Sequence, residues 1–295
     1  MKAFDEEAKQ YDGYGFLLLA LVKKAQHEAS REAQQPLQES STKVWADLKR
    51  FGHYAVRMYP LSWVGSREKI AKNLGVSTDA ILMVHFTDDD DGGHCPKFIL
   101  FFDHVVKSIV LSIRGTFSLK DAVLDAVAEE VEFLEGRAHK GIVSGAEIIL
   151  DKVLPTLTEA ARQQPDYRCL QMYIFPSRSK YLLFARVVVT GHSLGAGAAE
   201  LITMRLLGDS SLLPPSTRVE CVALAPPPVF RYRNIFSKIL KTIYLCRAAK
   251  TPPPGMTAAI SIYINNYDCV PRLSLASVAR LLASVRAVDG LGLSE

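Results

Sequence analysis

A serine set between two glycines is the feature of this sequence with the clearest capacity for chemistry. The segment 187–195 reads VVVTGHSLG, so Ser193 lies at the centre of a G-x-S-x-G pattern whose glycines are Gly191 and Gly195. Where an apolar strand turns sharply into a helix, such glycines leave room for the turn, and the serine hydroxyl is lifted off the strand end. The pattern therefore predicts a nucleophile elbow with Ser193 as the attacking group; a glycine-rich helix cap is the alternative.

The residues on either side of the serine have separate expected roles. Leu194 follows Ser193 at the predicted start of a helix, where free backbone N–H groups and the positive end of the helix dipole stabilise negative charge. Its amide is the expected first donor to an oxyanion. His192 occupies the variable position of the pattern, and we expect it to point away from the serine as a packed core histidine rather than to act as the base.

The elements that must position Ser193 alternate between strands and helices. Apolar and β-branched runs predict strands over 80–86, 97–102, 105–113, 187–190, 218–225 and 258–265, and helices over 119–128, 141–162, 193–207 and 274–288. Short turns separate the first three strands, which predicts a meander. The later alternation of strands and helices favours an α/β fold, with a mostly parallel sheet covered on both faces.

The first quarter of the chain has a different pattern. Helical periodicity runs from 16 to about 33 and resumes over 42–58, so residues 1–75 are predicted to be a helical segment and residues 76–295 the α/β domain. The run FLLLALV at 16–22 is far shorter than the roughly 20 residues of a membrane span. It is interpreted as a packed helix turn or as a shallow membrane contact.

The amino-acid composition limits the kinds of binding partner and the cellular compartment to be expected. The 295 residues are 48% apolar and carry a net charge of +4, from 35 basic and 31 acidic residues without a long basic run, which argues against nucleic acid. The five cysteines form no CxxC pair, and the N-terminus is polar and acidic rather than a signal peptide. We therefore expect a cytoplasmic protein with reduced thiols, in peripheral contact with a membrane surface.

An acidic run invites a metal interpretation. The residues of 88–93 read DDDDGG, but a calcium loop with its sixth-position glycine at Gly92 would begin at Thr87 and end at Phe98, neither of which is a suitable ligand. A solvated hairpin turn is favoured, and neither a metal nor an organic cofactor is expected.

Beyond these patterns, the sequence resembles a known family. The stretches GHSLGAG and SIRGT (112–116) look like those of the class 3 (fungal-type) lipases, with closest similarity to the sn-1-specific diacylglycerol lipases. The matching stretches occur in the order of the family, at 105–127, 138–149, 187–201, 220–229 and 268–282. The resemblance implies an α/β-hydrolase fold.

The resemblance also implies roles for individual residues. Thr116, in the Arg-Gly-Thr signature, matches the second oxyanion-hole position, and Asp268 matches the acid of a catalytic triad. Asp268 follows a predicted strand and should therefore share a sheet edge with Ser193; a loop carboxylate paired with Arg272 is the alternative. Arg114 is expected to anchor the end of its strand.

The triad histidine has no match in this sequence. The order in this fold is serine, acid, histidine, yet all seven histidines precede Asp268, and His139 matches a structural position instead. We therefore expect a chain truncated at its C-terminal end, without the final strand and histidine loop. The segments 168–186 and 231–255 also lack counterparts, and are interpreted either as lid or membrane-docking insertions or as the product of a misassembled gene.

These patterns together predict a serine ester hydrolase. It would cleave an acyl ester of a glycerolipid such as diacylglycerol, at a membrane or lipid-droplet surface, with Ser193 as nucleophile and no cofactor. Two alternatives remain. One is a catalytically impaired remnant that binds lipid or a partner without turnover, and the other is an esterase for small esters.

Overall fold

The strands of the chain form two sheets in the computed structural model. It describes residues 42–63, 65–86, 95–115, 129–163, 168–175, 178–232, 254–264 and 270–272, and the side chains of 168–184 are not part of that description. The large sheet contains β1 (Ile81–His85), β2 (Phe98–Asp103), β3 (Ser108–Ile113), β6 (Arg168–Phe175), β7 (Arg178–His192), β8 (Thr217–Leu224) and β10 (Ile260–Tyr263). The small sheet contains β4 (Glu130–Phe133), β5 (Gly136–His139) and β9 (Phe230–Tyr232).

The large sheet has the order β1-β2-β3-β7-β8-β10, with β6 paired to β7 off this path. Strands β1, β2 and β3 are antiparallel neighbours, which confirms the predicted meander. Strands β3, β7, β8 and β10 run parallel to one another. The parallel strands end at one edge, where His192 pairs with Leu224 and Leu224 with Tyr263. This edge is called the carboxyl edge below.

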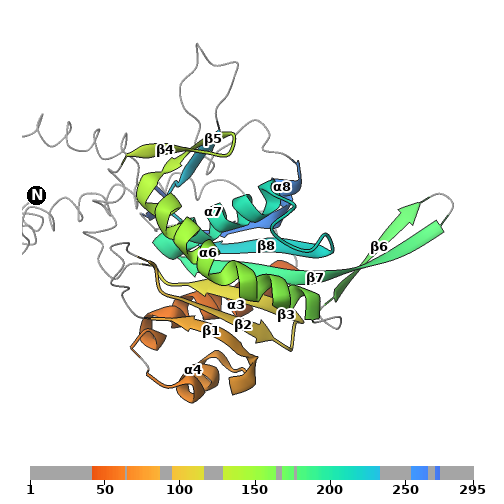
Figure 1. Cartoon of the computed structure of the whole chain (residues 1–295), viewed down its shortest axis with the longest axis horizontal. Helices are drawn as coiled ribbons and strands as arrows, with labels where there is room; N and C mark the ends of the chain where they lie inside the picture. The colour runs from red at the N-terminus through yellow and green to blue at the C-terminus, as the bar shows by residue number, and fades with distance from the viewer. Residues whose placement is uncertain are drawn as a thin grey trace, which may run out of the picture.

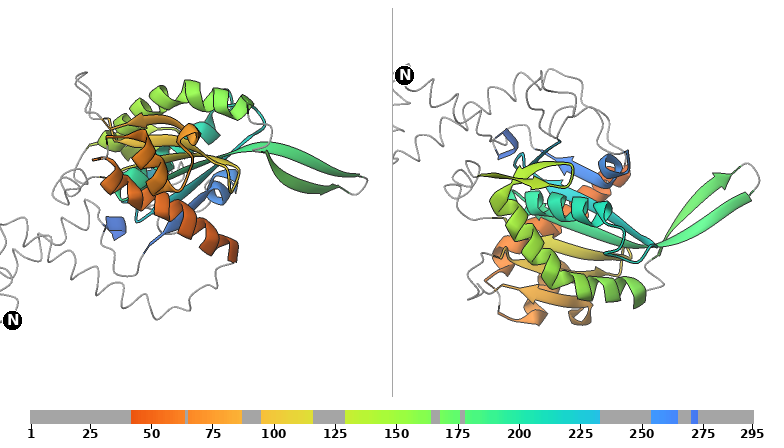
Figure 2. Two further views of the ribbon diagram at one scale, coloured as in Figure 1. Left: turned by 90° about the horizontal axis from the view of Figure 1, so that it is seen from below. Right: turned by 45° about the horizontal axis from the view of Figure 1, so that its top comes forward.

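Helices cover both faces of the sheet. The helices are α3 (Thr42–Leu61), α4 (Arg67–Leu74), α6 (Lys140–Gln163), α7 (Leu194–Gly208) and α8 (Pro254–Ala259), with short 3-10 turns η1 (Thr78–Ala80) and η3 (Val270–Arg272). Figure 1 shows α6 and α7 in front of the sheet and α3 behind it. Figure 2 shows α3 and α6 on opposite sides of the strands. Because both faces are covered, strands β2 and β3 are buried along their whole length.

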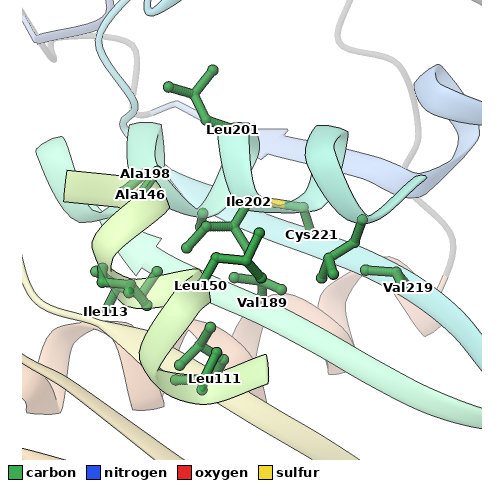
Figure 3. Packing of buried hydrophobic residues seen from close by; sticks show 14 of the residues in the cluster. Leu111, Ile113, Ala146, Leu150, Val189, Ala198, Leu201, Ile202, Val219 and Cys221 are labelled. Carbon is green, nitrogen blue, oxygen red and sulfur yellow. The ribbon is translucent and has the colours of Figure 1, made fainter. Parts of the chain in front are cut away.

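Two apolar clusters, one on each face, hold these layers together. On the α6–α7 face, Leu150 of α6 and Ile202 of α7 pack with Val189 of β7 (Figure 3). On the α3 face, Phe51 and Met58 pack with the neighbouring strands. Strand β7 contributes to both clusters, so burial on both sides fixes the strand that leads to Ser193.

Most differences from the predicted elements lie at their ends. The strand predicted over 105–113 begins at Ser108, because residues 104–107 form the turn from β2. The helix predicted to end at Met58 continues to Leu61, with Pro60 in its last turn. The helices predicted over 16–33, 119–128 and 274–288 lie outside the described residues, as do the acidic run and most of 231–255, and the domain boundary at residue 75 stays a prediction.

The segment 168–186 forms a hairpin. Strand β6 pairs antiparallel with the first half of β7, from Arg168 opposite Ala185 to Phe175 opposite Arg178. The second half of β7 enters the large sheet between β3 and β8. The hairpin therefore extends beyond the layered body of the protein, as Figures 1 and 2 show.

A carboxyl group is buried in α7, the helix that follows the elbow. Glu200 is 5% exposed, and its Oε1 makes no hydrogen bond within the described structure. Burial raises the pKa of Glu200 to about 8, because the charged form is poorly solvated there. At neutral pH the folded protein therefore favours the protonated carboxyl.

Replacing Glu200 by glutamine is expected to flatten the pH dependence of stability. The folded-state pKa lies above the unfolded one, so the stability present at acidic pH is lost as the pH rises toward the folded value. From about pH 6 to about pH 8, this loss should reach roughly 2 kcal/mol in the wild type and be absent in Glu200→Gln. Urea unfolding across that range measures it; equal slopes for both proteins would contradict the buried acid.

Candidate active site

Ser193 lies in a strained turn between β7 and α7. Its backbone has φ 56° and ψ −129°, a conformation that is rare for a residue with a side chain. The Ser193 amide donates a hydrogen bond to the Leu224 carbonyl of β8 at 2.9 Å, and the Ser193 carbonyl accepts one from Ala196 at 2.9 Å. The turn is thus fixed to the sheet on one side and to the helix on the other. The serine residue is 7% exposed.

Gly191 and Gly195 lack side chains where neighbouring backbone atoms lie too close for a Cβ. A Cβ on Gly191 would lie 2.4 Å from the carbonyl group of Gly195, and a Cβ on Gly195 would lie 2.5 Å from the carbonyl oxygen of Ile113. Neither neighbour is a flexible side chain. The start of α7 therefore packs directly against the ends of β7 and β3, which explains both glycines physically.

The chain after β3 also touches the elbow. A Cβ on Gly115 would lie 2.4 Å from the His192 carbonyl oxygen and 3.3 Å from the Ser193 Cβ. Gly115 therefore lies beside the serine, where the Arg-Gly-Thr signature is expected to contribute an oxyanion donor. Thr116 itself lies outside the described residues, so its role stays a prediction. Leu194, the other expected donor, is the first residue of α7.

His192 contacts Tyr59 of α3, a contact that the sequence did not predict. The Tyr59 hydroxyl and the His192 Nδ1 share a hydrogen bond of 2.9 Å, and the two rings meet edge to face with centroids 5.6 Å apart. The Tyr59 hydroxyl also lies 2.5 Å from the point where a Gly115 Cβ would be. Burial raises the pKa of Tyr59 to about 12, so the hydroxyl keeps its proton at neutral pH. Tyr59 of α3 thus contacts both His192 of the elbow and the chain at Gly115.

Replacing Tyr59 by phenylalanine is expected to slow the reaction of Ser193 with a fluorophosphonate probe about tenfold, because the elbow loses its hydrogen bond to α3. The free energy of unfolding should fall by only about 1 kcal/mol. Rates of labelling by a fluorophosphonate probe and urea unfolding measure the two effects. Tyr54→Phe is the matched control, since that hydroxyl bonds Asp103, far along the chain from the elbow; equal labelling by both variants would contradict the positioning role.

Arg114 joins the end of β3 to α3. Its Nη1 donates to the Ser62 Oγ at 2.8 Å, and its backbone amide donates to the Lys97 carbonyl at 2.8 Å. These contacts agree with the expected anchoring of the strand end. They also hold Gly115 in place, because it follows Arg114 directly.

A cavity of about 220 Å³ adjoins the elbow on the α6–α7 face. Small and apolar residues form much of its wall, among them Cys95, Ile142, Gly145, Leu194 and Ala198. Leu194 connects the two features, because its amide begins α7 while the residue itself lines the cavity. A chamber of this kind, next to the turn at Ser193, suits an apolar ligand.

The acid and the base of the predicted triad are not defined by this geometry. Strand β10 runs parallel to β8 and ends at the carboxyl edge, as expected for the strand that leads to Asp268, but Asp268 lies outside the described residues. No described histidine is hydrogen-bonded to the Ser193 hydroxyl. His139, predicted to be structural, accepts a hydrogen bond at Nδ1 from the Ile142 amide at 3.4 Å.

The described residues contain neither a membrane-spanning helix nor a cluster of metal ligands. No helix among them is both long enough and apolar enough to cross a bilayer. Within that same part of the chain, no three side chains of histidine, cysteine, aspartate or glutamate gather closely enough to hold a metal ion. Cys95 and Cys221 are buried cysteines that form no disulfide within the described structure.

The comparisons with known proteins point to one family. Residues 177–278 match the family model described as lipase (class 3). The chain is 31% identical to diacylglycerol lipase-beta of Mus musculus over 206 residues, which are 67% of this chain and 24% of that protein. It is 28% identical to the secreted mono- and diacylglycerol lipase A of Penicillium camembertii over 138 residues, or 45% of this chain and 38% of that one. The chain thus spans about a quarter to two fifths of these relatives.

Solved structures give the same fold. A fungal lipase–inhibitor complex superposes with a TM-score of 0.54 at 18% identity, covering 81% of this chain and 78% of the other. The propeptide complex of the Rhizomucor miehei lipase superposes with a TM-score of 0.51 at 18% identity, covering 81% of this chain and 66% of the other. At this level of identity the likeness shows the α/β-hydrolase fold alone.

Proposed function

Because residues 177–278 place this chain among the class 3 lipases, we propose that it is a serine hydrolase that cleaves an acyl ester of a glycerolipid. The observation that carries the proposal is the turn at Ser193. The positive φ of this serine, between β7 and α7, lifts its hydroxyl off the strand end, beside a backbone amide at the start of α7 that can hold an oxyanion.

The proposed reaction has two steps. The Ser193 oxygen attacks the ester carbonyl and loses its proton to a general base, while the Leu194 amide and Thr116 hold the negative oxygen. The tetrahedral intermediate collapses, the alcohol leaves with that proton, and water then hydrolyses the acyl-enzyme to release a fatty acid. Asp268 would orient the base. The base is not assigned to a residue, since all seven histidines precede Asp268.

Diacylglycerol is the proposed substrate, taken from a membrane or lipid-droplet surface. Two matched relatives carry diacylglycerol lipase in their names. The cavity beside Leu194 supports an apolar ligand, because small and apolar residues form much of its wall. We further propose that the protein meets this surface from the cytoplasm as a peripheral protein, and that it needs no metal or organic cofactor.

A second candidate is a protein that binds lipid without turning it over. The described structure favours it in one respect, because no described histidine is hydrogen-bonded to the Ser193 hydroxyl and a serine without a base is a weak nucleophile.

Labelling with a fluorophosphonate probe tests the proposal. Folded wild-type protein should be labelled with one probe per chain, and Ser193→Ala should not be labelled. Ser77→Ala is the matched control, because Ser77 is exposed and its side chain makes no capping hydrogen bond. Release of fatty acid from diacylglycerol then separates the candidates: labelling with release supports the hydrolase, whereas folded protein that is not labelled and releases no fatty acid supports the binding protein. Folded wild type that takes up no probe would overturn the proposal.

A further inference from the structure

The side of α3 that faces away from the sheet has an unusual composition. Its exposed residues, together with the exposed tryptophan just beyond the helix, are Trp45, Ala46, Lys49, His53, Val56, Arg57, Pro60 and Trp63. At about 100° per residue, the seven positions within α3 fall within an arc of roughly 120°. We call this set the outward face of α3.

Large apolar side chains on the outward face are exposed to an unusual extent. Trp63 is 78% exposed, Trp45 is 61% exposed and Val56 is 52% exposed. The two tryptophans lie at opposite ends of the face, 18 residues apart, and they are the only tryptophans in the sequence. Tryptophan prefers the interface between lipid and water, where its ring is buried and its N–H stays hydrated.

The charges of the outward face have one sign. Lys49 and Arg57 are exposed, and the face contains no carboxylate. The one acidic residue of α3, Asp47, is half-buried and forms an ion pair with Arg186 at 3.5 Å. Cations interleaved with apolar side chains on an exposed helix face are typical of helices that lie on an anionic lipid surface.

The same helix reaches the proposed active site. The C-terminal end of α3 supplies the Tyr59 hydroxyl that contacts His192, and Ser62 just beyond it bonds Arg114. Trp63 follows Ser62 and therefore lies near the carboxyl edge of the sheet. A membrane in contact with this end of the helix would lie close to Ser193.

We propose that the outward face of α3 docks the protein onto an anionic lipid surface. The orientation brings the carboxyl edge, with Ser193, to the bilayer from which the substrate would enter. The biological purpose of docking rests on the proposed function, but the binding itself needs no catalysis and can be measured without it.

Intrinsic fluorescence reports on this face directly, because both tryptophans of the chain belong to it. The full-length Ser193→Ala variant is titrated with mixed phosphatidylcholine–phosphatidylserine vesicles and with phosphatidylcholine vesicles. The mixed vesicles should shift the emission to the blue, and bromine-labelled lipids should quench it. Emission that stays unchanged while the protein floats with the mixed vesicles would overturn the proposal, because another surface would then bind.

Two pairs of variants identify the residues responsible. Lys49→Gln with Arg57→Gln should weaken flotation with mixed vesicles by roughly fivefold for each charge removed. The control removes two charges from α4, by Lys69→Gln with Lys72→Gln, and should have less effect. Trp63→Ser should weaken flotation about tenfold, whereas Val105→Ser, at a residue that is 76% exposed in the β2–β3 turn, should not. Equal losses for variants and controls would contradict the proposal.

The failure of docking and the failure of catalysis can be told apart. Variants of the outward face, made with Ser193 intact, should keep full fluorophosphonate labelling and full activity on a water-soluble short-chain ester. Loss of labelling in these variants would show that the face supports the fold rather than docking, and would overturn the inference. If the protein sediments as a dimer and binds neither kind of vesicle, the outward face would be assigned to contact with a second copy of the chain. That result would also overturn the inference.

Discussion

Replacing Gly195 by alanine is expected to abolish labelling at Ser193 and to lower the free energy of unfolding by at least about 3 kcal/mol. The added Cβ would lie 2.5 Å from the Ile113 carbonyl oxygen and 2.8 Å from the Gly115 amide nitrogen. Both are backbone atoms at the end of β3, so relief of the clash must separate α7 from the chain that borders the serine. Labelling kinetics and urea unfolding of the same variant measure the two effects.

Gly65 provides the matched control for this substitution. A Cβ on Gly65 would meet no atom within 4 Å, so Gly65→Ala should change stability by less than about 0.5 kcal/mol and leave labelling intact. If Gly195→Ala behaved like Gly65→Ala, the close packing of the elbow against β3 would be wrong.

Replacing Asp103 by alanine should be comparably damaging to stability, although Asp103 lies at the opposite edge of the sheet from Ser193. The carboxylate is fully buried, accepts two hydrogen bonds from Arg50, one of them at 2.6 Å, and accepts another from the Tyr54 hydroxyl at 2.7 Å. Its removal leaves the Arg50 charge and the Tyr54 hydroxyl without their partner, at a cost of about 3–5 kcal/mol. Chemical unfolding near neutral pH measures this loss of stability. Asp79→Ala is the control, because Asp79 is exposed.

The same carboxylate predicts a loss of stability in acid. Burial alone would raise the pKa of Asp103, but the hydrogen bonds from Arg50 and Tyr54 outweigh it, so the pKa lies below its ordinary value. Because the folded-state pKa is the lower one, the stabilisation is present above the unfolded value near about 4 and is lost as the pH falls through the folded value. Asp103→Asn should remove this part of the acid dependence, and an unchanged acid slope would contradict the assignment.

Local sequence patterns were sufficient to predict the strand, the turn and the helix around Ser193. The residues of 187–190 form a β-branched run of three valines and a threonine, and the small residues after Ser193 suit close packing of α7; the structure has a strand and a helix at those places. The meander of β1, β2 and β3 was predictable for the same reason, since a short turn separates the apolar runs of β2 and β3 and a polar segment with four aspartates separates those of β1 and β2. The roles of Thr116 and Asp268 came only from resemblance and stay predictions.

The contacts that local patterns cannot reveal join residues far apart in the chain. Tyr59 and His192 are 133 positions apart, and nothing near Tyr59 distinguishes it from the other apolar positions of its helix. Strands β4, β5 and β9 were missed because each has only three or four residues, too few to show a periodicity. Helix α3 was predicted as an element, but its packing against the elbow depends on the tertiary structure.

The hairpin of β6 and the first half of β7 has a consequence for how this protein can vary. Within the described structure, β6 pairs with β7 alone, so this ribbon lacks the cooperative support of a third strand. It can open locally at a small free-energy cost while residues 187–192 stay clamped between β3 and β8. Changes in the length or sequence of this hairpin should therefore leave the position of Ser193 unchanged. Such changes can accumulate during evolution with little loss of stability in the large sheet.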